Sequence, residues 1–365
     1  MAGSNHAGRW EKRWHPLRRE WVIYSAHRNN RPWDGETEQT AVTNPASYEP
    51  SCYLCPGNTR VGGATNPDYD GVYVFDNDHP VVGPDAPDAR EPAAAARGLA
   101  RVVCYHPRHD ITVGDLSEAQ VLDVLKTWRQ QTAELGARPD ILTVQIFENK
   151  GEACGTSSPH PHCQIYATDF VMAHPTRTLD TLANDRDTFR KLLDFEQQDP
   201  RRIVAGQPHA TAFVPYFARF PFEVWIFPKQ RAAHLTELDD DALAGLASLY
   251  REINQRYDAL FGMPFPYVMA LAQAPTDGVL HPDFHLHLKF FPPLRAPGLR
   301  KILAGAELGG GNFMNDTIPE ETAEQLRAVV IPNNAAATNE KHAEADKADK
   351  ADMADKADKA PKEAT

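Results

Sequence analysis

Residues 158–164 read Ser-Pro-His-Pro-His-Cys-Gln, and this stretch says most about the fold and the site. In an extended segment alternate side chains share one face, so we expect His160, His162 and Gln164 to point the same way. The two prolines have no N–H, which suits the entrance of a strand. Such a face would suit a nucleophile beside a phosphate clamp. The plain alternative is a strand with two surface histidines.

The residue types in this stretch fit phosphoryl or nucleotidyl transfer. A neutral imidazole nitrogen can attack phosphorus at physiological pH and leave again, which divides one difficult transfer into two easier ones. The amide of Gln164 can donate hydrogen bonds to a phosphate oxygen as charge develops there.

The stretch belongs to a pattern that occurs twice. The first copy contains, in order, expected elements at 101–105 (strand), 117–135 (helix), 141–147 (strand) and 160–167 (strand). The second copy has the same order at 223–227, 240–261, 267–273 and 285–289. Both end in a His-x-His strand, with Lys289 where the first copy has Gln164. The duplication predicts an α+β fold with one fused, mostly antiparallel sheet, shaped as a half-barrel, and helices packed outside.

Composition limits the classes of partner. The chain has 365 residues and a formal net charge of −12, so it lacks the basic footprint that nucleic acid requires. No apolar run approaches the roughly 18 residues of a membrane helix, and residues 1–13 carry no apolar signal core. We therefore expect no nucleic-acid or membrane partner, and a cytoplasmic location.

The five cysteines are unevenly spaced and do not form a disulfide framework. Cys52 and Cys55 form a Cys-x-x-Cys pair typical of metal binding, and Cys104 lies in an apolar run that indicates a buried residue. Cys154 and Cys163 flank the histidines, where packing is favoured over a ligand role.

These motifs together resemble the galactose-1-phosphate uridylyltransferase family of the histidine-triad superfamily. The resemblance rests on His-Pro-His-x-Gln after Phe-Glu-Asn-Lys-Gly (147–151), on the Cys-x-x-Cys pair and on Arg-Pro-Trp at 31–33. It covers most of residues 14–330. Combined, the motifs are far more specific than a lone His-x-His.

The resemblance implies a role for each matching residue. His162 would be the nucleophile that becomes uridylylated, and Gln164 would hold an oxygen of the α-phosphate. The implied substrate-binding residues are Arg28 and Arg31 at the uracil or phosphates, Asn77 and Asp78 at the ribose, and Asn149 and Ser157 at the diphosphate. An ordinary turn is the alternative for the Asn77-Asp78 pair.

The resemblance also implies a structural zinc ion held by Cys52, Cys55, His109 and His160. Two thiolates and two imidazoles form a tetrahedral set that zinc prefers. The ion would join the Cys-x-x-Cys loop to the strand that carries His162. The alternative is a knuckle without metal.

Two other parts depart from the family pattern. At a second metal site of some members, Thr178 and Ala272 stand at ligand positions, which leaves His285 and His287, with His281 nearby. We therefore expect that site to be absent or altered. Lys301 and Glu307 align with the segment that reaches the hexose, but residues 309–316 differ from the best-known pattern, so the sugar's identity stays open.

The expected organisation follows from these matches. Residues 1–13 are predicted to be a flexible N-terminus, 14–195 and 196–331 to be two histidine-triad-like halves, and 332–365 to be a disordered Ala/Asp/Lys-rich tail. The nucleophile and the zinc site fall in the first half. The resemblance suggests a homodimer.

The expected function is transfer of UMP from UDP-glucose to galactose 1-phosphate by a ping-pong reaction through uridylyl-His162. The products would be UDP-galactose and glucose 1-phosphate, and the partners are therefore a small nucleotide sugar and a sugar 1-phosphate. Three alternatives stay open: a related transferase for another sugar 1-phosphate or nucleotide, a nucleotide-sugar hydrolase, and a zinc-stabilised nucleotide sensor without catalysis.

Overall fold

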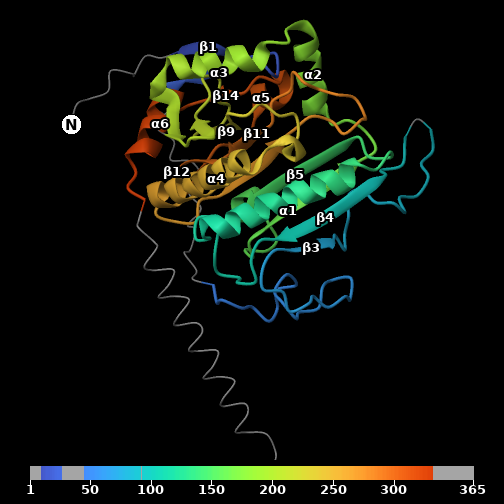
Figure 1. The fold of residues 1–365 in the computed structure, drawn as a ribbon. Coiled ribbons are helices and arrows are strands. Elements are labelled where there is room, and N and C mark those ends of the chain that lie inside the picture. The colour runs from blue at the N-terminus through green and yellow to red at the C-terminus, as the bar shows by residue number, and fades with distance from the viewer. Residues whose placement is uncertain (1–9, 27–44, 92, 332–365) are drawn as a thin grey trace, which may run out of the picture. The chain divides into compact units, whose positions relative to one another are not determined.

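An open antiparallel sheet runs through the computed structural model, which describes residues 10–26, 45–91 and 93–331 (Figure 1). In the order in which they lie side by side, its strands are β3 (Tyr73–Asp76), β4 (Gly98–Cys104), β6 (His162–Thr168), β5 (Thr143–Lys150), β10 (Tyr267–Ala272), β11 (His287–Phe291), β9 (Val224–Pro228), β8 (Ala210–Phe213) and β7 (Ile203–Gly206). Strands β3 and β7 are its two edges, so the sheet does not close into a barrel.

The two copies of the sequence pattern meet in the middle of this sheet. Strand β5 of the first copy pairs antiparallel with β10 of the second, with Phe147 opposite Ala270. The prediction of one fused antiparallel sheet is therefore confirmed. Strand β6 begins at His162, directly after the two prolines, as expected for residues that cannot donate to a ladder.

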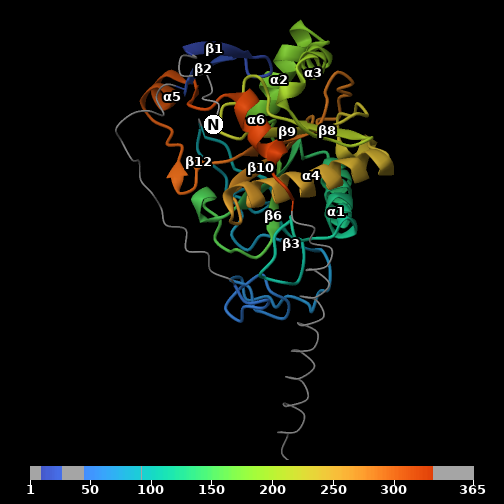
Figure 2. The ribbon, with the colours of Figure 1, turned by 90° about the vertical axis from the view of Figure 1, so that its left-hand side faces the viewer.

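Two long helices cover one face of the sheet. Helices α1 (Glu118–Gly136) and α4 (Asp240–Phe261) lie side by side in both views (Figures 1 and 2). Each begins at a capping side chain: Ser117 accepts a hydrogen bond from the backbone N–H of Gln120, and Asp239 accepts one from that of Ala242. Buried residues of both helices pack on the sheet in one continuous core.

The opposite face of the sheet is covered mainly over the second copy. Strands β1 (Trp10–His15) and β2 (Glu20–Ser25) and helices α2 (Ala173–Asn184) and α3 (Thr188–Gln198) enclose a second core there, which includes Phe189, Trp225 and Phe227. Over β6 the same face leaves His162 and Gln164 half-buried. The first copy therefore keeps an accessible surface where the second has lost it.

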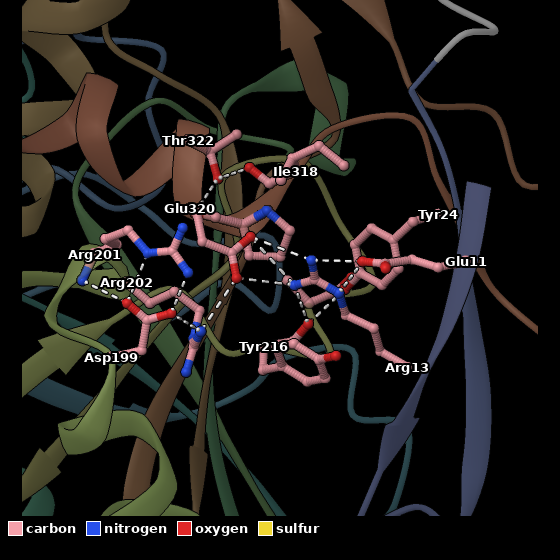
Figure 3. Close-up of polar contacts among 12 residues, drawn as sticks. Glu11, Arg13, Tyr24, Asp199, Arg201, Arg202, Tyr216, Ile318, Glu320 and Thr322 are labelled. Carbon is pink, nitrogen blue, oxygen red and sulfur yellow. Dashed lines mark hydrogen bonds and ion pairs between the residues drawn. The ribbon is translucent and has the colours of Figure 1, made fainter. Parts of the chain in front are cut away.

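Strand β1 includes residues 10–13, which were expected to belong to the flexible N-terminus. Arg13, expected in a flexible segment, is buried and lies 3.2 Å from Glu320 of α6 (Pro319–Ala328), as Figure 3 shows. Glu320 also pairs with Arg202 at 3.1 Å, and Arg202 pairs with Glu196 at 2.6 Å. These ion pairs link β1 to α6.

Short elements complete the body. Strand β14 (Met314–Asn315) pairs with β2 in parallel, β12 (Leu294–Ala296) and β13 (Leu299–Arg300) form a hairpin, and α5 (Gly305–Gly310) follows it. Short 3-10 helices lie at Glu152–Cys154, Pro200–Arg202 and Leu235–Glu237. None of the described helices is long and apolar enough to cross a membrane.

Candidate active site and metal centre

Four buried side chains meet beneath the end of β4 and β6. Cys52, Cys55, His109 and His160 place one ligand atom each within 4.8 Å of all the others. The Sγ of Cys55 lies 3.6 Å from Nδ1 of His109 and 3.5 Å from Nδ1 of His160. Tetrahedral zinc with ordinary Zn–S and Zn–N bonds separates its ligand atoms by ~3.3–3.8 Å. The cluster therefore has the composition and spacing of a site that could bind a metal ion.

The protonation pattern of His160 fits a metal ligand as well. The Tyr69 hydroxyl donates to the backbone carbonyl of Leu54 at 2.6 Å, and its oxygen lies 3.0 Å from Nε2 of His160. That oxygen can accept a hydrogen from Nε2, which leaves Nδ1 with its lone pair toward Cys55. Burial lowers the pKa of His160 to about 3 and raises that of Cys55 to about 11 when no ion offsets the cost of charge.

His162 is oriented by its own strand entrance. Its Nδ1 lies 2.7 Å from the backbone carbonyl oxygen of His160. Because a carbonyl only accepts, Nδ1 must carry the hydrogen, and Nε2 therefore keeps the lone pair. Burial lowers the pKa of His162 below its ordinary value, so the imidazole is neutral at physiological pH.

Gln164 lies two residues further along the same face of β6. Its Oε1 accepts hydrogen bonds from Nδ2 of Asn77 at 3.4 Å and from the Tyr166 hydroxyl at 3.3 Å. Both bonds are at the carbonyl end, so the amide nitrogen and its two hydrogens face away from them. The structure thus brings together Gln164 and Asn77, two of the predicted site residues.

A small cavity opens beside His162. It is lined by residues of β5, by the loop after it and by the strand entrance, including Glu148, Asn149, Gly151 and Thr156. Asn149 was predicted at the site, whereas Glu148 was not. Glu148 accepts hydrogen bonds from the hydroxyls of Tyr250 and Tyr267, which no local sequence pattern brings together.

The remaining predicted residues have different surroundings. Asp78 lies 3.8 Å from Arg60, whose guanidinium is 4.3 Å from the ring of Phe75. Arg60 was not predicted at this place. Ser157 is exposed, and its hydroxyl lies 2.6 Å from that of Tyr53. Arg28 and Arg31 lie outside the described residues.

Two family models match the chain over most of its length. The description of the first is galactose-1-phosphate uridyl transferase, N-terminal domain, over residues 3–172, and that of the second is the C-terminal domain, over residues 179–347. The chain belongs to the galactose-1-phosphate uridylyltransferase family. The protein is therefore an enzyme of the nucleotidyltransferase class.

Individual members of the uridylyltransferase family are similar to this chain over most of its length. The chain is 39% identical to the galactose-1-phosphate uridylyltransferase of Haemophilus influenzae, a match that covers 87% of this chain and 94% of that one. It is 37% identical to the enzyme of Rattus norvegicus, which covers 87% of each chain.

Solved structures share the fold. A uridylyltransferase structure that is 29% identical has a TM-score of 0.69 and covers 87% of this chain and 97% of its own. The structure of an ADP-glucose phosphorylase from Arabidopsis thaliana with bound ADP-glucose has a TM-score of 0.72 at 24% identity, and covers 88% of this chain and 100% of its own. At that identity the likeness concerns the fold alone.

The residues singled out in the sequence for a second metal site make other contacts. Thr178 and Ala272 line one cavity, and neither carries a metal-ligating imidazole or carboxylate. His285 donates from Nε2 to the carbonyl of Pro228 at 2.9 Å, and His281 lies 3.0 Å from Asp277. His287 stacks on Phe227 with 4.4 Å between ring centroids.

The two residues predicted at the hexose contact each other. Nζ of Lys301 lies 2.6 Å from Oε1 of Glu307, and the side chains are 8% and 3% exposed. Little of either is accessible to a sugar within this chain. Their role at the hexose stays a prediction.

Proposed function

We propose that this protein transfers UMP from UDP-glucose to galactose 1-phosphate through a covalent uridylyl-His162, giving UDP-galactose and glucose 1-phosphate. The observation that carries the proposal is the bond from Nδ1 of His162 to the carbonyl of His160, which leaves a neutral Nε2 with a lone pair beside the cavity. Membership of the uridylyltransferase family supplies the substrates.

The first half-reaction forms one bond and breaks one. The lone pair of Nε2 forms a bond to the α-phosphorus, and the bond from phosphorus to the bridging oxygen breaks, with its electron pair leaving on glucose 1-phosphate. The leaving group is a phosphate, so a strong general acid is not needed. Positive charge that develops on the imidazole is stabilised at Nδ1–H by the His160 carbonyl.

The second half-reaction reverses these steps with another sugar phosphate. A phosphate oxygen of galactose 1-phosphate attacks the α-phosphorus, the phosphorus–nitrogen bond breaks, and Nε2 regains its lone pair. We propose that the Gln164 amide donates to a non-bridging oxygen in both steps, since its carbonyl end is already held by Asn77.

We propose that the nucleotide is held by Asn77 and Asp78 at the ribose and by Asn149 and Ser157 at the diphosphate, with Arg28 and Arg31 completing the site. Asp78 can accept from ribose hydroxyls, and Asn149 lines the cavity beside His162. The exposed position of Ser157 leaves its hydroxyl accessible to a ligand.

We propose that Cys52, Cys55, His109 and His160 hold a structural zinc ion. Bound there, the ion would lower the cost of burying the two thiolates and would fix the loop of residues 52–55 to the strand entrance. His160 would then be held at its side chain while its carbonyl orients His162.

Initial rates test the proposed function. A double-displacement transferase gives parallel lines when UDP-glucose is varied at several fixed concentrations of galactose 1-phosphate, and it exchanges labelled glucose 1-phosphate into UDP-glucose without acceptor. Intersecting lines and no exchange would contradict it. A panel with ADP-glucose and other sugar 1-phosphates distinguishes a related transferase, and product formation without acceptor indicates a hydrolase.

We further propose that the protein is a homodimer. Trp10, Trp14 and Trp21 of β1 and β2 are between 41% and 76% exposed, and such aromatic side chains are enriched at interfaces. Light scattering coupled to size exclusion should give twice the 40.6 kDa of one chain, and Trp10→Ser with Trp21→Ser should shift the mass toward that of the monomer.

A further inference from the structure

A second cavity lies beside β11, and the charges of its lining side chains are unbalanced. Four cationic side chains line it, from the β1–β2 turn, α2, the segment before β9 and β11: Arg18, Arg177, Arg219 and Lys289. None of its lining residues is a carboxylate, although the whole chain carries a net charge of −12. The cavity shares no lining residue with the one beside His162.

Two carboxylates lie near these cations, Glu20 and Glu223, and each already accepts a hydrogen bond. Glu20 accepts from Nε of Arg18 at 2.8 Å and is 3.9 Å from Nη1 of Arg219. Glu223 accepts from the backbone N–H of Arg219 at 2.7 Å and from Nε1 of Trp225 at 2.8 Å. The cations therefore outnumber the acidic groups around them.

Arg219 gives independent support for a missing ligand. Its side chain is 7% exposed, and its Nε has no hydrogen-bond partner among the described residues. An unpaired buried donor on a charged group is costly, and an anion in the cavity would remove that cost. The guanidinium packs 4.5 Å from the ring of Phe313, so it is held in place.

The pKa values of neighbouring groups reflect the same positive field. Burial, followed by the charges of Arg18, Lys289 and Arg219, lowers the pKa of His174 to about 3. His174 consequently stays neutral and accepts from Arg18 at 2.7 Å. The pKa of Arg219 itself is also lowered, first by burial.

The internal duplication relates Lys289 of this cavity to Gln164 of the first copy. His287 donates from Nδ1 to the carbonyl of His285 at 2.8 Å, as His162 does to that of His160 at 2.7 Å. Lys289 is therefore the counterpart of Gln164 on the same face of the sheet. This step rests on the proposed phosphate contact of Gln164, whereas the charge imbalance and the unpaired Arg219 do not.

We propose that this cavity is a second anion site that binds a phosphate group through Lys289, Arg219, Arg18 and Arg177. Its volume of about 60 Å³ suits a single oxyanion, because cavities for whole small molecules are roughly 300 Å³ or larger. Because His287 stacks on Phe227, its imidazole is not accessible to a bound phosphate. The site therefore binds phosphate and does not transfer a phosphoryl or nucleotidyl group.

Titration of the full-length protein with sodium phosphate, against sodium chloride at matched ionic strength, tests this site. Isothermal titration calorimetry should detect phosphate binding in the wild type and in His162→Ala. Lys289→Met should weaken it about tenfold or more, and Arg177→Gln about threefold, because each removes a charge-assisted contact. Arg177 is exposed, so its substitution leaves the core intact.

Controls locate the bound phosphate. Arg190→Gln removes an equally exposed arginine of α3 that does not line the cavity, and it should leave the affinity unchanged. Binding that survives Lys289→Met and Arg177→Gln but is lost in Gln164→Ala would overturn the proposal, as would no phosphate effect beyond that of chloride. A parallel titration with glucose 1-phosphate, in His162→Ala with and without Arg177→Gln, distinguishes the ligands: a site that takes phosphate esters binds it with an affinity that Arg177→Gln lowers, whereas a site for free phosphate alone shows no binding that depends on Arg177.

Discussion

Among single residues, His162 shows how a backbone carbonyl can prepare a side chain for reaction. The bond to the His160 carbonyl selects one tautomer, and burial keeps the ring neutral. The same contact joins His287 to His285 in the second copy, which has no prolines there, so it follows from the spacing of two histidines along an extended chain.

Gln164→Ala should lower kcat by about 100-fold, because it removes a donor aimed at charge that develops on the phosphate. Gln164→Glu should be at least as damaging, since it replaces the donor with a negative charge of nearly the same shape. Steady-state assays with UDP-glucose and galactose 1-phosphate measure both. A KM that rises while kcat is unchanged would instead assign Gln164 to ground-state binding.

Tyr69→Phe should weaken metal binding about tenfold, since it removes only the hydroxyl that accepts from Nε2 of His160. Metal analysis by mass spectrometry after dialysis against a graded chelator measures this, with Tyr73→Phe on the neighbouring strand as control. Cys55→Ser should remove the metal altogether. Equal metal content in Tyr69→Phe and the wild type would argue against the proposed tautomer.

At the scale of elements, the two halves differ in how one face of the sheet is covered. Helices α2 and α3 with β1 and β2 bury one face of the second half, so Phe189 and Trp225 pack there, whereas β6 leaves the equivalent face open. The covering elements are anchored by the ion pairs of Glu320 with Arg13 and Arg202.

Glu320→Gln should destabilise the protein by about 2 kcal/mol, because it removes a carboxylate that two buried arginines share, although Glu196 still pairs with Arg202. Urea unfolding followed by circular dichroism measures the change. Glu324→Gln, an exposed position on the same helix, should alter the free energy of unfolding by less than about 0.5 kcal/mol. Similar effects of the two substitutions would show that the ion pairs contribute little.

Much of the fold could be predicted from local patterns, and the rest depends on contacts between distant residues. The helix starts at Ser117 and Asp239 follow from capping residues, and the strand entrance at His162 follows from the prolines. The burial of Arg13 could not be predicted, because its partner Glu320 is 307 residues away. The position of Glu148 depends likewise on tyrosines of two other elements.

The residues of the candidate site that belong to family motifs could be predicted from the sequence. The four ligand positions of the metal cluster come together as the resemblance implied. The cationic cavity was not predicted, since its basic residues are scattered along the chain and only Lys289 lies in a motif, the second His-x-His strand. Lys301 and Glu307 were assigned from alignment alone, and their mutual contact became visible only in three dimensions.

In the whole molecule, Glu148 joins the two halves. It lies on β5 of the first half and accepts from Tyr250 and Tyr267 of the second. Burial raises its pKa to about 7 from an ordinary value of 4.5. A raised folded-state pKa means that stability is fully present below about pH 4.5 and is lost as pH rises through about 7.

Glu148→Gln should therefore flatten the dependence of stability on pH between about 4.5 and 7. The difference of pKa corresponds to roughly 3 kcal/mol across that range, on the scale of 1.36 kcal/mol per pKa unit. Melting temperatures measured across the range, relative to the wild type at each pH, check this. An unchanged pH profile would mean that Glu148 does not titrate in the folded protein.

The most direct test of the proposed mechanism is peptide mapping of the protein after brief incubation with UDP-glucose and no acceptor. Mass spectrometry at mildly alkaline pH, where phosphoramidates survive, should find a uridylyl group on His162, and none in His162→Ala. His79→Ala, an exposed histidine, should keep the label. The label should disappear when galactose 1-phosphate is added, with UDP-galactose formed in equal amount. An enzyme that makes UDP-galactose while His162 stays unmodified, or that remains active as His162→Ala, would contradict the account.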